Sequence, residues 1–340
     1  MIQTKSRPLT DKLAFDESST KTLDIPMDND IRRMSLLVNI DIVQGATPGS
    51  VLHDSGMGIL PLLKKIRLVM NSDDNKFNLD GTKWYIVETM EKGTTPQLTT
   101  LPTPSVTATY YVLLQADFAS FRQDLSDISA LLPAPDLSSL VLEVDYGKAD
   151  GDLYETIANT VITDATSGIE VTLTEVFETE KGKTVQSQVE GGYIDIREGV
   201  DVFDVTKVND SYDTSVLTQT INPTPAKILT FLLLTREDTG TAAEKNRVDD
   251  VLTQIRIENV KGDGERIFDS KEKNLQFENK TEYGIETLIT GAYYLDMIDQ
   301  RRGGLRNFET EAVKWKFLTN APDGAETDQI EVYTRYVSGI

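Results

Sequence analysis

The segment ILPLLKKIRLVM, residues 59–70, has a counterpart in VDDVLTQIRIEN, residues 248–259. In both segments apolar residues recur at i, i+3, i+4 and i+7 and then alternate with polar ones around Arg67 and Arg256. A turn of helix that leads into a half-buried strand is the simplest structure for this pattern. The matching apolar residues are 189 positions apart (252 − 63 = 189): Ile59, Leu62, Leu63 and Ile66, and Val248, Val251, Leu252 and Ile255. The alternative to a duplication is a chance match, because such apolar sets are common.

Two further pairs of segments repeat in the same order. Tyr110-Tyr111 corresponds to Tyr293-Tyr294, 183 residues later, and residues 140–146 correspond to residues 330–336, 190 residues later. This spacing predicts two copies of one unit. Irregular loops, rather than tight hairpins, favour a Greek-key sandwich over an up-and-down barrel. The predicted fold class is all-β, with two tandem eight-stranded jelly-roll sandwiches and short helices in the loops.

Changes in composition predict the domain boundaries. The first 22 residues are polar with little periodicity, which predicts an arm that is disordered or ordered by a partner. The predicted parts are the N-terminal arm 1–22, the first jelly roll 23–178, a charged linker 179–191 and the second jelly roll 192–340. KWYIVETM, residues 83–90, is predicted as a strand from its aromatic and β-branched residues, and FRQDLSDISALL, residues 121–132, as a helix.

Composition excludes several classes of protein. The chain of 340 residues has no cysteine, so disulfides, thiolate metal sites and cysteine nucleophiles are excluded. Its one histidine, His53, lies in a polar, glycine-rich stretch and is predicted to be a loop residue. No apolar run approaches the roughly 20 residues of a membrane span.

The net charge of −21 argues against direct binding of nucleic acid, which normally needs a basic patch. The basic clusters are short and are predicted to be strand or loop surface. They are Arg32-Arg33; Lys64, Lys65 and Arg67; and Arg301, Arg302 and Arg306.

The sequence predicts no catalytic residue and no cofactor. Lys181-Gly182-Lys183-Thr184 contains the GKT of a P-loop, but Phe177 stands where that motif needs a glycine. Three acidic turns are candidates for calcium, although none has the EF-hand spacing, so a metal site stays an open question. They are Asp73-Asp74 with Asn71 and Asn75; Asp145, Asp150 and Asp152; and Asp263 with Glu265. A pair of carboxylates for glycoside hydrolysis stays possible among 55 acidic residues, but no pair stands out.

The two tyrosine pairs have two interpretations. They are a platform for sugar binding, or they place one ring in the core and one on the surface of a strand. The second interpretation is favoured, because successive side chains of a strand point to opposite faces.

The tandem pattern resembles the double jelly-roll major capsid proteins of tailless icosahedral viruses. The resemblance covers nearly the whole chain, and it rests on the polar N-terminal segment, IRRMSLLVNIDI, LLKKIRLVMNSDD and KWYI, followed by a second cycle from PAKILTFLLL and VDDVLTQIRI. It implies a structural protein, not an enzyme, in which each chain supplies two upright sandwiches to a pseudo-hexagonal homotrimer. It also implies a place in the virion shell after synthesis in the host cytoplasm. Minor capsid or penton proteins and an internal viral membrane are further partners of such a shell.

Two other functions are weighed against this one. The first alternative is a two-domain β-sandwich protein for carbohydrate binding or surface adhesion. The second is a glycan-cleaving enzyme on a jelly-roll scaffold, which should expose a convergent acid pair in a cleft. The mass of the protein in solution separates assembly from both alternatives.

Overall fold

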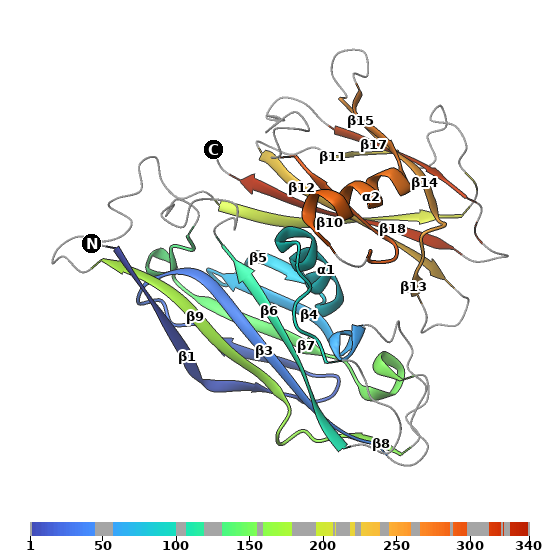
Figure 1. Cartoon of the computed structure of the whole chain (residues 1–340). Coiled ribbons are helices and arrows are strands. Elements are labelled where there is room, and N and C mark those ends of the chain that lie inside the picture. Colours follow the sequence, from blue (N-terminus) through green and yellow to red (C-terminus); the bar gives the residue numbers. More distant parts are fainter. Residues whose placement is uncertain are drawn as a thin grey trace. The chain divides into compact units, whose positions relative to one another are not determined.

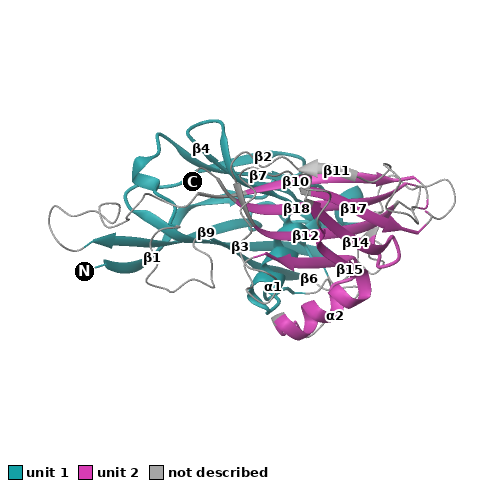
Figure 2. Ribbon diagram, turned by 90° about the horizontal axis from the view of Figure 1, so that it is seen from above, with its two compact units in different colours: residues 1–196 teal, residues 197–340 magenta. Residues whose placement is uncertain are grey.

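A computed structural model describes residues 2–44, 57–99, 107–118, 131–154, 159–178, 195–206, 208, 218–221, 226–238, 245–259, 266–285, 288–297, 313–320, 322 and 327–338. The chain divides into two compact units, residues 1–196 and 197–340 (Figure 2). The boundary lies close to residue 192, where the second jelly roll is predicted to start, and the predicted linker 179–191 lies outside the described residues. None of the described helices is long and apolar enough to cross a membrane.

The first unit is a sandwich of two antiparallel sheets. One sheet has the strand order β1-β9-β3-β6, with β8 also paired to β3, and the other has the order β2-β7-β4-β5 (Figure 1). The elements are β1 (Ile2–Ala14), β2 (Thr20–Asp24), β3 (Asp30–Gln44), η2 (Leu60–Leu62), β4 (Leu63–Met70), β5 (Asp74–Leu79), α1 (Gly81–Lys92), β6 (Thr107–Asp117), η3 (Ala134–Asp136), β7 (Leu140–Tyr146), η4 (Ala149–Leu153), β8 (Thr160–Ile162) and β9 (Gly168–Glu178).

The second unit repeats this arrangement. Its sheets have the orders β10-β18-β12-β13, with β16 also paired to β12, and β11-β17-β14-β15. The elements are β10 (Asp195–Val205), β11 (Thr218–Ile221), β12 (Ala226–Asp238), β13 (Lys245–Arg247), β14 (Leu252–Asn259), β15 (Arg266–Lys271), α2 (Glu272–Tyr283), β16 (Ala292–Asp296), β17 (Val313–Thr319) and β18 (Asp328–Ser338).

Both units have jelly-roll topology. When the short β8 and β13 are set aside, each unit has eight described strands. The first, eighth, third and sixth strands form one sheet, and the second, seventh, fourth and fifth form the other. The long central strands supply much of the core. In β3, for example, alternate residues are buried between the two sheets: Met34, Leu36, Val38 and Ile40. The predicted fold class, two tandem eight-stranded jelly rolls, is confirmed.

Matching irregularities confirm the 189-residue repeat. The pairing of β4 with β7 shifts between Leu63 and Lys65, and the pairing of β14 with β17 shifts between Leu252 and Gln254. The pairings with β5 and β15 shift at a second common place, after Leu68 and after Ile257. Bulges are structural features with fixed positions, so two bulges at the same spacing make Ile66 and Ile255 equivalent.

The predicted turn of helix is present in the first copy only. There the 3₁₀ helix η2 precedes β4, whereas residues 249–251 form a bend before β14. The helix-like spacing of Leu63 and Ile66 comes from the bulge, because the extra residue Lys64 lets two side chains three positions apart face the same core. Of the six residues predicted to be buried here, Val248 is half-buried and the others are buried: Ile59, Leu62, Leu63, Val251 and Leu252.

Tyr110 and Tyr293 lie in equivalent strands, β6 and β16, but not at equivalent positions. The bulged residues of the third strands are Arg32 and Leu229. Their carbonyl oxygens accept from the N–H groups of Phe118 at 3.0 Å and Met297 at 2.8 Å. These anchors make Leu114, not Tyr110, the counterpart of Tyr293, so the predicted match was wrong by four residues (297 − 118 = 179, and 293 − 114 = 179).

The predicted match of residues 140–146 with 330–336 was wrong. The first segment is β7, which lies between β2 and β4, and the second lies in β18, between β10 and β12. The counterpart of β7 is β17, because Val144 pairs with Ile66 as Phe317 pairs with Ile255. Alternation of apolar residues marks a strand but does not give its place in a sheet.

Residues 2–14 and 20–22 of the predicted arm 1–22 are strands of the first sandwich, so the prediction of a segment that is disordered or ordered by a partner was wrong there. Strand β1 pairs with β9 from Ile2 opposite Glu178 to Ala14 opposite Gly168, and β2 pairs with β7. Most side chains of β1 are exposed, so the strand lacks the apolar alternation that marks a half-buried one.

The segment 83–90, predicted as a strand, is part of helix α1. The side chain of Asp80 accepts from the Lys83 N–H at 2.8 Å and caps the start, and Gly93 ends the helix with φ 70°. Helix α2 ends in the same way at Gly284, with φ 68°. These caps override the β propensity of the intervening residues. The helix predicted at 121–132 lies outside the described residues except for its last two positions.

Truncation of the repeated leucines should test the duplicated core. Leu63→Ala and Leu252→Ala should each lower the unfolding free energy by about 2–5 kcal/mol, because each removes a fully buried side chain from its own sandwich. Urea unfolding measures the loss. A change below roughly 0.5 kcal/mol would mean that the residue does not pack in a core.

Candidate assembly surfaces

In the two candidate calcium turns that the structure describes, several oxygens accept hydrogen bonds from the protein itself. Asn71 accepts from the Ser138 N–H at 2.8 Å, and Asp145 accepts from the Thr20 hydroxyl at 2.6 Å. Asp152 accepts from Lys64 at 2.6 Å and from the Lys148 N–H at 2.9 Å. Burial alone would raise the pKa of Asp152, but these two donors lower it below its ordinary value.

The described residues contain no group of three or more acidic or histidine side chains that could hold a metal ion. Asp263, Glu265 and His53 lie outside those residues, as does the GKT segment. Whether the chain binds a metal ion therefore stays an open question.

The basic clusters that the structure describes form ion pairs across strands. Arg33 pairs with Asp117 at 2.5 Å, and Arg67 pairs with Glu143. With the Lys64–Asp152 contact, they neutralise local charge on the surface. This fits the interpretation of strand surface rather than a nucleic-acid footprint. Arg301, Arg302 and Arg306 lie outside the described residues.

The two tyrosine pairs differ in exposure. Tyr110 is buried and Tyr111 is 45% exposed, as expected for one ring in the core and one outside. Tyr293 and Tyr294 are both buried, so the prediction of one ring on the surface was wrong for this pair. The second pair offers no platform for a sugar.

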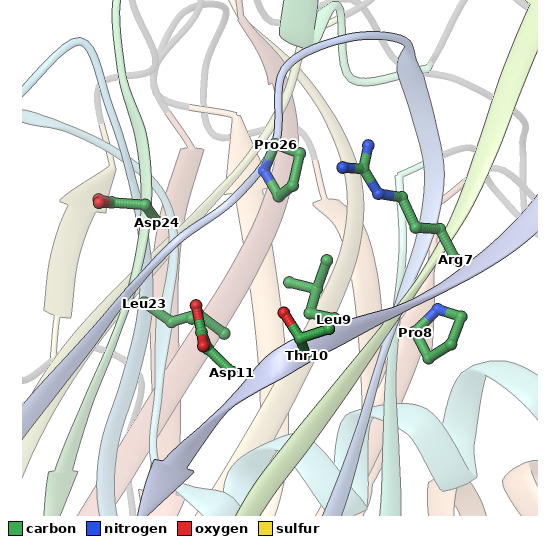
Figure 3. A pocket seen from close by; sticks show the side chains of 8 residues that line it. All are labelled: Arg7, Pro8, Leu9, Thr10, Asp11, Leu23, Asp24 and Pro26. Carbon is green, nitrogen blue, oxygen red and sulfur yellow. The ribbon is translucent and has the colours of Figure 1, made fainter.

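A small pocket lies between the two edge strands β1 and β2 (Figure 3). Its volume of about 170 Å³ is below the roughly 300 Å³ at which small-molecule sites begin. It forms where the pairing of β1 with β9 is interrupted between Pro8 and Lys12, since proline has no N–H to donate to a ladder. The pocket is lined by Arg7, Pro8, Leu9, Thr10, Asp11, Leu23, Asp24 and Pro26. It follows from the break in the strand and has no convergent catalytic groups.

Exposed apolar side chains gather on the outer face of the β3–β6–β8 sheet. Leu37 and Leu113 are opposite each other across β3 and β6, and Val43 and Val161 are opposite each other across β3 and β8. Tyr111 lies on the same face, opposite Asn39, and is next to Leu113 along this face of β6. These five side chains form one group rather than scattered exposure, and such a group on one face of a sheet is a candidate contact surface.

Helix α2 exposes a single large apolar side chain, Phe277, among polar ones. It packs on β14, β15 and β16 through buried Leu275, Gln276 and Asn279. Asn279 fixes the helix by donating to the Tyr294 carbonyl at 2.7 Å and accepting from the Tyr294 N–H at 2.9 Å. Phe277 points away from these contacts and is 61% exposed.

Helix α1 has a buried carboxyl, Glu88, five residues before its terminal Gly93, just as Asn279 stands five residues before Gly284. Glu88 accepts from Lys92 at 2.6 Å and from the Gln115 N–H at 2.9 Å. Burial is the main cause of its raised pKa, and the negative charge of Asp117 adds to it, although Lys92 opposes both.

This pKa shift predicts a pH dependence. Because folding raises the pKa of Glu88, the folded state holds the proton more tightly than the unfolded chain, and stability falls as pH rises from about 4.5 through the folded value. We expect Glu88→Gln to abolish this fall, so the variant should gain stability relative to the wild type as pH increases. Urea unfolding at several pH values measures the difference. If Glu88→Gln loses stability relative to the wild type as pH rises, the pKa of Glu88 is not raised by folding.

Comparison with solved structures places the fold among viral capsid proteins. The chain superposes on the major capsid protein of Sulfolobus Turreted Icosahedral Virus with a TM-score of 0.69 and 15% identity, over 98% of this chain and 91% of that one. The major capsid protein P2 of bacteriophage PM2 gives 0.53 and 10%, over 98% and 97%. The PBCV-1 virus capsid gives 0.57 and 10%, over 99% and 95%. No protein-family model and no curated protein sequence matches the chain. The fold is the double jelly roll of these capsid proteins, and the likeness extends over nearly the whole chain.

Proposed function

We propose that the chain is a structural major capsid protein that forms homotrimers and tiles an icosahedral virion shell. The observation that carries the proposal is the duplication itself, two jelly rolls with equal strand order and matching bulges. The similar structures are major capsid proteins of icosahedral viruses, and the likeness covers nearly the whole chain.

The duplication suits a shell for a geometric reason. Three copies of a chain with two similar units give six similar blocks around one axis, and such a ring packs in a hexagonal lattice. A closed cyclic ring is also the usual outcome for one type of chain. The shell surface, minor capsid or penton proteins and an internal membrane are the partners that belong to this proposal, with synthesis in the host cytoplasm. Its subunits act through contacts, without catalysis.

Light scattering of the purified full-length protein tests the proposal. A species of three chain masses, with a six-lobed outline in negative-stain microscopy, is the expected result. Interfaces of at least about 2,000 Å² per pair of chains are expected for such a stable ring. A strict monomer at high concentration, over a range of salt, would overturn the proposal and favour the carbohydrate-binding or adhesion protein.

A further inference from the structure

Helix α2 carries one aromatic side chain that the rest of its unit does not cover. Phe277 is 61% exposed, the largest fraction among the exposed large apolar side chains that the structure describes. Residues three and four positions away lie on the same face of a helix. Here they are polar and exposed, and two of them are lysines: Lys273, Asn274, Lys280 and Thr281. Glu278, the next residue, points about 100° away around the helix. The helix therefore presents a single ring flanked by two positive charges.

The pocket between β1 and β2 has the size of one aromatic ring. Its volume is about 170 Å³, and a cavity of about 150 Å³ in a protein core can hold a benzene molecule. Part of its wall is apolar, from Pro8, Leu9, Leu23 and Pro26. The pocket is too small for an ordinary small-molecule ligand, but it is large enough for one side chain.

The charges around this pocket complement those beside Phe277. Two exposed aspartates, Asp11 and Asp24, line it on the side away from Arg7 (Figure 3). Arg7 contacts Asp28 at 2.8 Å and Glu175 at 3.3 Å, so its own charge is balanced within the unit and its side chain is restrained. A restrained guanidinium can stack on an aromatic ring. The pocket thus offers an acidic rim to a basic partner and a wall that suits a ring.

We propose that Phe277 of one chain inserts into this pocket on a second copy of the chain. The two lysines of the helix then lie against the two aspartates of the rim. A second copy is the occupant because its exposed ring matches the volume and its flanking charges are opposite to those of the rim. The contact joins the second unit of one copy to the first unit of the next, and such head-to-tail contacts can close into a ring. This inference rests on the proposed capsid trimer and names one of its contacts.

Truncation of the ring tests the insertion. Phe277→Ala should raise the apparent dissociation constant of the trimer about thirtyfold, because it removes an aromatic anchor from its pocket. Phe277→Tyr, which keeps the ring, should keep the trimer, and so should Val202→Ala, at an exposed apolar position of β10. Sedimentation over a dilution series measures the constants, and thermal unfolding verifies that each variant is folded. A Phe277→Ala trimer as tight as the wild type would overturn the proposal.

Charge reversal tests the match between helix and rim. Lys273→Glu combined with Lys280→Glu should weaken the trimer about tenfold, because like charges then face each other. Asp11→Lys combined with Asp24→Lys should weaken it by a similar factor. The chain with all four substitutions should assemble again, since every contact regains opposite charges. A fourfold variant that assembles no better than the two double variants would overturn the pairing of this helix with this pocket.

A cross-link identifies the chain that supplies the ring. The chain has no cysteine, so Thr10→Cys at the pocket and Asn274→Cys beside Phe277 introduce the only two thiols. A short bismaleimide should join them between chains and give products of two and three chain masses on a denaturing gel. With Val161→Cys, at an exposed position of β8, in place of Thr10→Cys, the gel should show single chains. A linked product of one chain mass only would place the contact within a chain and overturn the second copy.

The outcomes separate this contact from the capsid function. A wild-type trimer with no cross-link and no effect of Phe277→Ala would overturn the contact and leave the capsid trimer standing. A monomeric wild type would overturn both.

Discussion

Removal of residues 2–15 should unfold the first sandwich, because this segment is part of its core sheet. The deletion takes away β1, the neighbour of β9. It removes buried Leu13 and Phe15, the second of which packs edge-on against Tyr146 with ring centres 5.1 Å apart. The Tyr146 hydroxyl also donates to the Leu13 carbonyl at 2.8 Å.

The deletion also isolates a buried charge. Lys5 and Arg7 lie 3.0 Å and 3.3 Å from the carboxylate of Glu175, whose side chain is fully buried. Loss of the partners of a buried charge costs about 3–5 kcal/mol, and loss of a buried aromatic side chain costs about 3–5 kcal/mol more. Their sum is comparable with the roughly 5–15 kcal/mol that stabilises a domain.

Hydrogen exchange measured by mass spectrometry can localise the effect. In the deletion variant the amides of β3 and β9 should exchange fast, while those of β12 and β18 keep their protection. Phe15→Ala should give a partial effect, and Thr4→Ala, at an exposed position of β1, should give none. Unchanged protection of β9 in the deletion variant would mean that residues 2–15 are not part of the sandwich, as expected for the predicted arm that is disordered or ordered by a partner.

The sequence contains enough to predict the duplication but not every equivalence within it. The 189-residue spacing holds because two bulges occupy the same positions in both copies. The helical periodicity that marks the repeat is partly the product of the bulge at Lys64, which a sequence pattern cannot distinguish from a helical turn. The two Tyr-Tyr pairs occur in equivalent strands, but Tyr110 and Tyr293 do not occupy equivalent positions in those strands.

The strand predicted at 83–90 shows the limit of composition. Its aromatic and β-branched residues have strand propensity, but the capping signals Asp80 and Gly93 flank it in the sequence and decide for a helix. Propensity is a weak signal that packing and caps override. The capping residues Asp80 and Gly93 are therefore the sequence signal that predicts helix α1.

The exposed apolar group on β3, β6 and β8 could not be predicted from the sequence. Leu37 and Leu234 both stand five residues after the bulged residue of their strand, Arg32 or Leu229, yet Leu37 is 36% exposed and Leu234 is 1% exposed. Exposure depends on what packs over a strand, and a strand's own pattern does not contain that information. Only the comparison of the two units distinguishes the open surface.

The other large effect on stability is expected in the second unit, from substitution of Trp315. This residue is fully buried, with the Phe231 ring edge-on at 4.5 Å and the Phe317 ring stacked at 5.7 Å between centres. Trp315→Ala should lower the unfolding free energy of the second unit by about 3–5 kcal/mol from the lost side chain, and by about 0.5–1.5 kcal/mol more from each lost ring contact.

Graded variants and the other tryptophan make this prediction specific. The chain has two tryptophans, so Trp315→Ala leaves Trp84, in helix α1 of the first unit, as the sole tryptophan and a fluorescent reporter of that unit. Hydrogen exchange of β12 and β17 then reports the second unit. Trp315→Leu, which copies the residue at the equivalent position Leu142, should cost less than alanine. Trp315→Phe should cost least, because within the described residues the buried indole N–H has no hydrogen-bond partner to lose. If Trp315→Ala lowers the unfolding free energy of the second unit by less than about 1 kcal/mol, Trp315 is not central to that core.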